Sequence, residues 1–173
     1  MHALGLERGS SFGAHVGVSR DIAELAELRR VRDRALGADT IDPSVDGRLA
    51  RAFVRSEAYR ALSRRMLTRT ELGVDHPSEP SIAKLFRTEL RHEIFDLGLA
   101  TVGELAELDH TSDELHARFG PDIGDIWEHW HHEYWYSRAA KIFAGTSEVQ
   151  RNIIAERRLG LPKEDQGAAR TGR

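Results

Sequence analysis

The feature of the sequence that most constrains the fold is an apolar stripe with helical spacing in the middle of the chain. Its seven residues recur mostly at intervals of three and four: Ile82, Phe86, Leu90, Ile94, Leu97, Leu105 and Leu108. This spacing places them on one face of an α-helix and predicts a helix that is buried along one side. No alternation of apolar and polar residues is long enough to predict a β-strand, so we expect an all-α protein.

Other stretches with the same period extend this prediction to the whole chain. Helices are predicted over residues 10–35, 44–72 and 125–143 and from residue 147, with breaks at 37–43 and 73–80 and a polar segment at 109–124. Long helices with short breaks and no internal repeat indicate an antiparallel up-down helical bundle of four long helices plus a C-terminal helix. We expect this bundle to occupy residues 1–163, and we expect residues 164–173 to form a disordered tail.

Composition limits the classes of partner that the protein can have. A formal net charge of −3 over 173 residues argues against nucleic acid or an anionic membrane as the main partner. No apolar run approaches the roughly 18 residues that a membrane-spanning helix needs, and the first residues lack the pattern of a signal peptide. The sequence contains no cysteine, which excludes disulfides and thiolate chemistry. We therefore expect a cytoplasmic protein.

The last predicted helix follows a glycine and two hydroxyl residues. Ser147 and Gln150 have the spacing of a capping box, and the helix is expected to bury one apolar face formed by Val149, Ile153 and Ile154. A glycine followed by hydroxyls at a helix start exposes free N–H groups at the positive end of the dipole, which suits a phosphate group. An ordinary capped helix after a tight turn is the alternative interpretation.

The residues around this helix are more specific than their spacing. Gly-Thr-Ser-Glu-Val-Gln-Arg-Asn occupies 145–152 and is followed by Ile-Ala-Glu-Arg at 154–157 and Leu-Gly-Leu-Pro at 159–162. From Tyr136 to Pro162 the sequence closely resembles the C-terminal signature of the acyl-CoA dehydrogenases, flavoenzymes that desaturate acyl-CoA thioesters. The resemblance implies an antiparallel bundle, FAD as cofactor, an acyl-CoA substrate from fatty acid metabolism, and a homo- or hetero-oligomer.

The resemblance also implies roles for individual residues. Many family members have a catalytic glutamate directly before the Gly-Thr pair, where this chain has Ala144. Others place it at the start of the first helix of the bundle, before an arginine, and the matching residues here are Glu7 and Arg8. Glu7 is therefore the candidate catalytic base, and Arg8 is a candidate substrate-binding residue. Gly145, Thr146 and Glu148 match the positions that face the flavin nucleotide.

The family fold also implies that this chain is incomplete as an enzyme. An N-terminal helical domain and a middle β-domain precede the bundle in the family and supply most contacts to the flavin ring and to CoA. The chain is then a fragment, a split-gene subunit or a remnant, and it needs the remaining domains or a partner subunit. The alternative is a non-catalytic bundle that serves as an assembly or oligomerisation partner.

An aromatic and histidine-rich run occupies residues 127–136. His129 with Glu133, and Glu128 with His132, lie one helical turn apart, which could present two metal ligands on one face. The HExxH order is missing and no third ligand is identifiable, so packing at a boundary is the preferred interpretation and no metal ion is expected. Relatives bring this helix close to the acyl end of the substrate pocket, and Trp130 is therefore a candidate substrate-binding residue.

Overall fold

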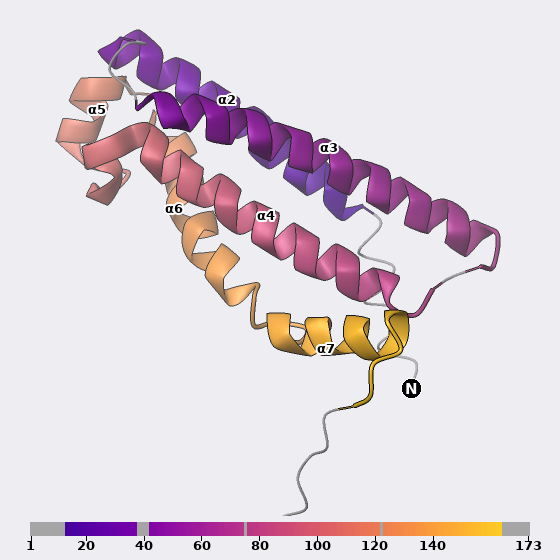
Figure 1. The fold of residues 1–173 in the computed structure, drawn as a ribbon. Helices are drawn as coiled ribbons and strands as arrows, with labels where there is room; N and C mark the ends of the chain where they lie inside the picture. Colours follow the sequence, from indigo (N-terminus) through magenta and orange to yellow (C-terminus); the bar gives the residue numbers. More distant parts are fainter. Residues whose placement is uncertain (1–12, 38–41, 75, 122, 164–173) are drawn as a thin grey trace, which may run out of the picture.

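The computed structural model describes residues 13–37, 42–74, 76–121 and 123–163, and this part of the chain contains helices but no strand. Figure 1 shows long helices packed side by side, with shorter helices towards their ends. The elements in chain order are α2 (Ala14–Leu36), α3 (Pro43–Glu71), α4 (Glu79–Val102), the 3₁₀ helix η2 (Gly103–Glu107), α5 (Asp113–Phe119), α6 (Ile123–Ala139) and α7 (Ser147–Arg158). The all-α prediction is confirmed, and the predicted helices match these within a few residues.

Helix α4 is the centre of the bundle. It contacts α2 and α3 on one side and α6 and α7 on the other, as Figure 1 shows. Leu90, Ile94 and Leu97 of the predicted stripe have no exposed surface, because other helices enclose α4 there, whereas Ile82 and Phe86 near its start are half-buried. The stripe was expected to continue to Leu108. Instead α4 ends at Val102, since Gly103 has a φ of 74° and turns the chain into η2.

The polar segment after η2 is held against the bundle by a few apolar side chains. Helix α5 has Leu115 and Phe119 one turn apart, and both are buried. The indole N–H of Trp127, at the start of α6, donates a hydrogen bond of 2.9 Å to the carbonyl oxygen of Leu108. These contacts fix the end of the bundle that lies farthest from α7 in Figure 1.

The terminal helix differs from its prediction. Val149 is 47% exposed and Ile153 and Ile154 are half-buried, so they do not form a buried face. The buried residues of α7 are Ser147 and Gln150, and the Gln150 side chain reaches back to the preceding turn. The expected tail at residues 164–173 lies outside the described residues. Within the described ranges, every helix is too short or too polar to cross a lipid bilayer.

Candidate functional site

A pocket opens between α4 and α6, next to the turn that precedes α7. Its volume is about 310 Å³. One wall carries three cationic side chains of α4, Lys84, Arg87 and Arg91, which share a face because they lie three and seven residues apart. The opposite wall is formed by side chains from α6 and the turn, including Tyr136, Ala140, Phe143 and Ala144. A cationic wall opposite an apolar wall suits a ligand with both an anionic and an apolar part.

Lys84 connects this pocket to the turn before α7. Its Nζ donates a hydrogen bond of 2.5 Å to the carbonyl oxygen of Gly145. Burial, followed by repulsion from the charge of Arg87, lowers the pKa of Lys84 below its ordinary value. No hydrogen bond or ion pair joins Arg87 to the other described residues, so its charge is available to a ligand.

The turn has a backbone conformation that favours small residues. Ala144 and Gly145 have φ values of 54° and 91°. The side chain of Gln150 donates a hydrogen bond of 3.0 Å back to the carbonyl oxygen of Ala144. A Cβ atom at position 145 would lie 2.7 Å from Nε2 of Gln150, so the close return of that side chain requires glycine here.

The cap of α7 is one residue earlier than the sequence predicts. Thr146 is the N-cap, and its Oγ1 accepts a hydrogen bond of 3.3 Å from the backbone N–H of Val149. The expected capping box of Ser147 and Gln150 is therefore wrong, because Gln150 reaches back to the turn instead. The side chain of Glu148 is 77% exposed. Its pKa is lowered by a hydrogen bond from its own backbone N–H and by the Thr146 side chain, so this helix start stabilises negative charge.

Arg91 is the third cation of the pocket, and its charge is already paired with two carboxylates. Its Nε donates a hydrogen bond of 2.7 Å to Asp21 of α2, and its Nη2 donates one of 2.6 Å to Glu133 of α6. Burial acts to lower its pKa, but these two carboxylates outweigh burial and raise it. Arg91 thus ties three helices together, and Lys84 and Arg87 remain as the cations that face the α7 end of the pocket.

The predicted site residues fall into three groups. Gly145, Thr146 and Glu148 lie together at the turn and the start of α7, next to the pocket. Glu7 and Arg8 lie outside the described residues. Trp130 has no exposed surface and packs edge-on against Phe95, with ring centroids 4.8 Å apart. Any contact between Trp130 and a substrate stays a prediction.

Sequence reasoning missed the cationic wall of the pocket. Lys84, Arg87 and Arg91 are absent from the residues that the sequence predicts for the site. The signal was present, because positions 84, 87 and 91 share one helix face. The sequence does not show that α6 and the turn at Ala144 lie opposite this face and complete the pocket.

Comparisons with known proteins agree with the fold and with the C-terminal motif. The family model for the C-terminal domain of acyl-CoA dehydrogenase matches residues 1–159 of this sequence. A relative named acyl-CoA dehydrogenase IpdE1 from Mycobacterium tuberculosis is 32% identical over 170 residues, covering 96% of this chain and 38% of the relative. A protein of the same name from Mycolicibacterium smegmatis is 30% identical, covering 96% of this chain and 37% of that protein. The chain thus spans less than two-fifths of these relatives.

Solved structures share the helical arrangement. A chain of the Tcur3481-Tcur3483 steroid ACAD has a TM-score of 0.70 at 20% identity, covering 91% of this chain and 38% of that one. The ChsE4-ChsE5 complex from Mycobacterium tuberculosis has a TM-score of 0.58 at 27% identity, with 83% of this chain and 37% of that chain covered. Each of these structures is named for a pair of proteins.

Proposed function

The chain belongs to the acyl-CoA dehydrogenase family, and on this basis we propose that it forms the C-terminal helical part of an FAD-dependent enzyme that introduces an α,β double bond into an acyl-CoA thioester. The observation that carries the proposal is the pocket of Lys84 and Arg87 beside the start of α7. Two cations and a helix N-terminus together favour an anionic group such as a pyrophosphate.

The residues at the turn fit a nucleotide cofactor. Thr146 and the exposed Glu148 can hydrogen-bond to polar groups of the nucleotide. Arg87 has a charge that is free to pair with a phosphate. Bound FAD would supply the oxidant that accepts the hydride from the β carbon of the substrate.

The proton on the α carbon needs a base from the protein. Ala144, which stands directly before Gly145, has no group that can accept a proton. Glu7 is therefore the proposed base, with Arg8 beside it as a proposed substrate contact. An apolar pocket that excludes water would raise the pKa of such a glutamate towards the working pH, which makes it an effective base.

The domains that complete the site are proposed to lie elsewhere. Since this chain spans only 38% of its relative, the rest of the cofactor and substrate site would come from a longer polypeptide or from a partner subunit. The similar solved structures are each named for a pair of proteins, which supports a hetero-oligomer as one such arrangement.

The deciding experiment is expression of the chain with and without the product of the neighbouring upstream reading frame, followed by absorbance at flavin wavelengths. Bound flavin and acyl-CoA oxidation in the co-purified sample support the proposal. In that sample Glu7→Gln should abolish turnover and retain flavin, whereas Arg87→Gln should weaken flavin binding. An assembly that oxidises acyl-CoA equally well with Glu7→Gln would refute the role of Glu7.

A second candidate function is that of a non-catalytic assembly partner. It is favoured by the large apolar side chains that α6 and the following turn leave exposed, among them Trp135 at 69% and Ile142 at 65%. Such residues mark a surface that another protein covers. A co-purified complex that lacks flavin and loses its partner upon Ile142→Glu would support this function over the first.

A further inference from the structure

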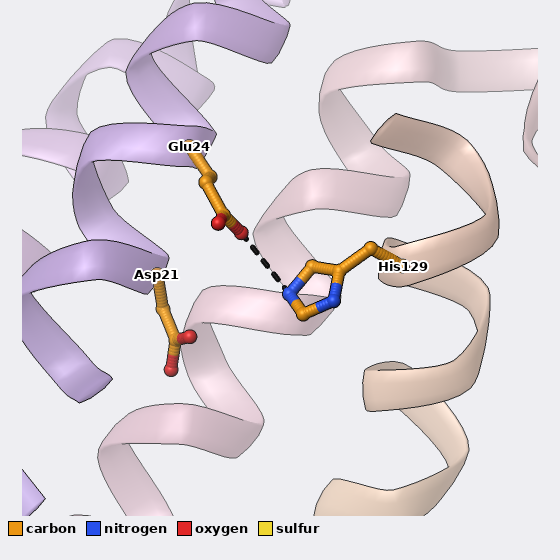
Figure 2. A group of neighbouring side chains, drawn as sticks. All are labelled: Asp21, Glu24 and His129. Atoms are coloured by element: carbon orange, nitrogen blue, oxygen red, sulfur yellow. Dashed lines mark ion pairs between the residues drawn. The ribbon is translucent and has the colours of Figure 1, made fainter. Parts of the chain in front are cut away.

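Three side chains that can bind metal ions meet between α2 and α6, away from the pocket that Lys84 and Arg87 line. Asp21 and Glu24 lie one turn apart on α2, and His129 of α6 faces them, as Figure 2 shows. Oε2 of Glu24 lies 3.0 Å from Nε2 of His129. One ligand atom from each of the three residues lies within 4.8 Å of the others.

One of the three side chains leaves a buried polar atom without a partner. This atom is Oδ1 of Asp21, which has no hydrogen-bond partner among the described residues, whereas Oε2 of Glu24 and Nε2 of His129 form an ion pair with each other. Asp21 has no exposed surface at all, and Arg91 binds only its Oδ2. In Figure 2 its carboxylate points into the space between the helices. Buried polar atoms are almost always paired, so the unpartnered Oδ1 of Asp21 beside this ion pair indicates a missing ligand.

The surrounding charges favour a cation at this point. Asp21 and Glu24 together carry two negative charges, which match a dication. Arg91 does not neutralise them fully, because its other end is paired with Glu133. Arg20 lies 3.4 Å from the other oxygen of Glu24, but its side chain is 63% exposed and screened by solvent.

We propose that Asp21, Glu24 and His129 bind a divalent transition-metal ion of the zinc class. An imidazole nitrogen with two carboxylate oxygens is a donor set that zinc and its neighbours accept, whereas magnesium and calcium prefer oxygen ligands alone. Zinc ligands lie about 2.0–2.2 Å from the ion, so the ligand atoms must draw together slightly. Glu24, whose side chain is 35% exposed, has the freedom to do so.

The geometry leaves room for further ligands. A cavity of about 240 Å³ adjoins the site and is lined by Glu24, His129, Glu27, Asp125 and Ile126. Three protein ligands and an open side resemble the zinc sites that keep a position for water. Arg91 holds the carboxylate of Asp21 in place, as outer-shell hydrogen bonds do at metal sites. The site is separate from the pocket that Lys84 and Arg87 line, and it does not depend on the proposed enzymatic function.

The test is a titration of the full 173-residue chain with Zn²⁺, and with Co²⁺ as a spectroscopic probe. The proposal expects one ion per chain, visible Co²⁺ absorption bands and a Tm that rises with Zn²⁺. His129→Gln and Asp21→Asn should each weaken binding at least tenfold. His132→Gln, on the same helix but with a side chain that is 72% exposed, is the matched control and should bind as the wild type does.

Two results would overturn the proposal. One is a wild-type chain that binds no Zn²⁺ at 100-fold molar excess, in which case His129 and Glu24 form only an ion pair. The other is Zn²⁺ binding that His132→Gln weakens and His129→Gln does not, which would place the ion elsewhere. Helix content from circular dichroism confirms that each variant is folded, and loss of Co²⁺ bands from a folded His129→Gln variant supports the site directly.

Discussion

Gly98 of α4 and the indole ring of Trp130 on α6 are in direct contact in the core: a Cβ atom at position 98 would lie 2.3 Å from Cε3 of Trp130. The glycine therefore allows α4 and α6 to approach as closely as they do. Trp130 is enclosed between Gly98 and Phe95. Half-buried His129, on the same helix as Trp130, faces Glu24 of α2.

Gly98→Ala should destabilise the fold although alanine is the better helix former. The helix propensity gain is about 1 kcal/mol, but overpacking a filled core costs about 1–3 kcal/mol, and the ring of Trp130 cannot move aside. Urea unfolding measures the difference. Gly47→Ala in α3 is the control, because a Cβ there meets nothing within 4 Å; it should be neutral or stabilising. Equal effects at the two positions would contradict the contact.

Trp130→Ala should cost about 3–5 kcal/mol of unfolding free energy, as removal of a buried aromatic side chain generally does. Trp130→Phe should cost much less, because the buried Nε1 of the indole has no hydrogen-bond partner among the described residues. In an active assembly, Trp130→Phe is the variant with which to measure acyl preference. Unchanged selectivity would limit Trp130 to a structural role.

Thr146→Ala should lower the stability of α7 by about 1 kcal/mol, the usual cost of losing an N-cap side chain. Ser147→Ala is the matched control and should have a smaller effect, because it leaves the hydrogen bond from Val149 to Thr146 intact. Hydrogen exchange of the α7 amides measures both. A larger effect of Ser147→Ala would contradict Thr146 as the N-cap and would support the capping box that the sequence predicts at Ser147.

Lys84→Met should loosen the turn before α7 by removing the hydrogen bond to the carbonyl oxygen of Gly145. The expected cost is about 1 kcal/mol, which corresponds to several-fold faster exchange of the amides at 145–150. Lys163→Met removes the same charge from an exposed position and should leave those amides unchanged. Identical exchange in the two variants would show that Lys84 does not hold the turn.

Stability should depend on pH through Asp21. Burial raises the pKa of this carboxyl above its ordinary value of 3.8, so the folded protein binds the proton more tightly than the unfolded chain does. The contribution of Asp21 to stability is therefore greatest below pH 3.8 and is lost as pH rises through the folded pKa. Unfolding measured with a chelator present should show this loss in the wild type and not in Asp21→Asn. If the wild type instead gains stability relative to Asp21→Asn as pH rises over that range, the prediction is contradicted.

The bundle could be predicted from the sequence because the apolar residues of α4 repeat with helical period, and helices of this length bury one face. The C-terminal motif indicated the family by its resemblance to the family signature. Its turn is equally local, because Gly145 has a positive φ and Thr146 is the N-cap of α7. Both properties are local, and local properties can be read along a chain.

What could not be predicted depends on tertiary contacts. Gln150 was expected to cap α7, yet it is drawn to Ala144 because the turn offers a free carbonyl oxygen. His129 was paired with Glu133 on its own helix, yet it faces Glu24 across the bundle. Spacing within one helix cannot show which neighbouring helix a side chain will meet.

The left-handed backbone of Ala144 has a consequence for how the active site could have changed during evolution. This conformation costs an ordinary residue about 1–2 kcal/mol, and alanine gains no catalytic group in return. A chain that already tolerates this geometry needs only one codon position to differ for an acidic side chain to appear there. Ala144→Glu combined with Glu7→Gln would thus move the proposed proton acceptor from one end of the sequence to the other.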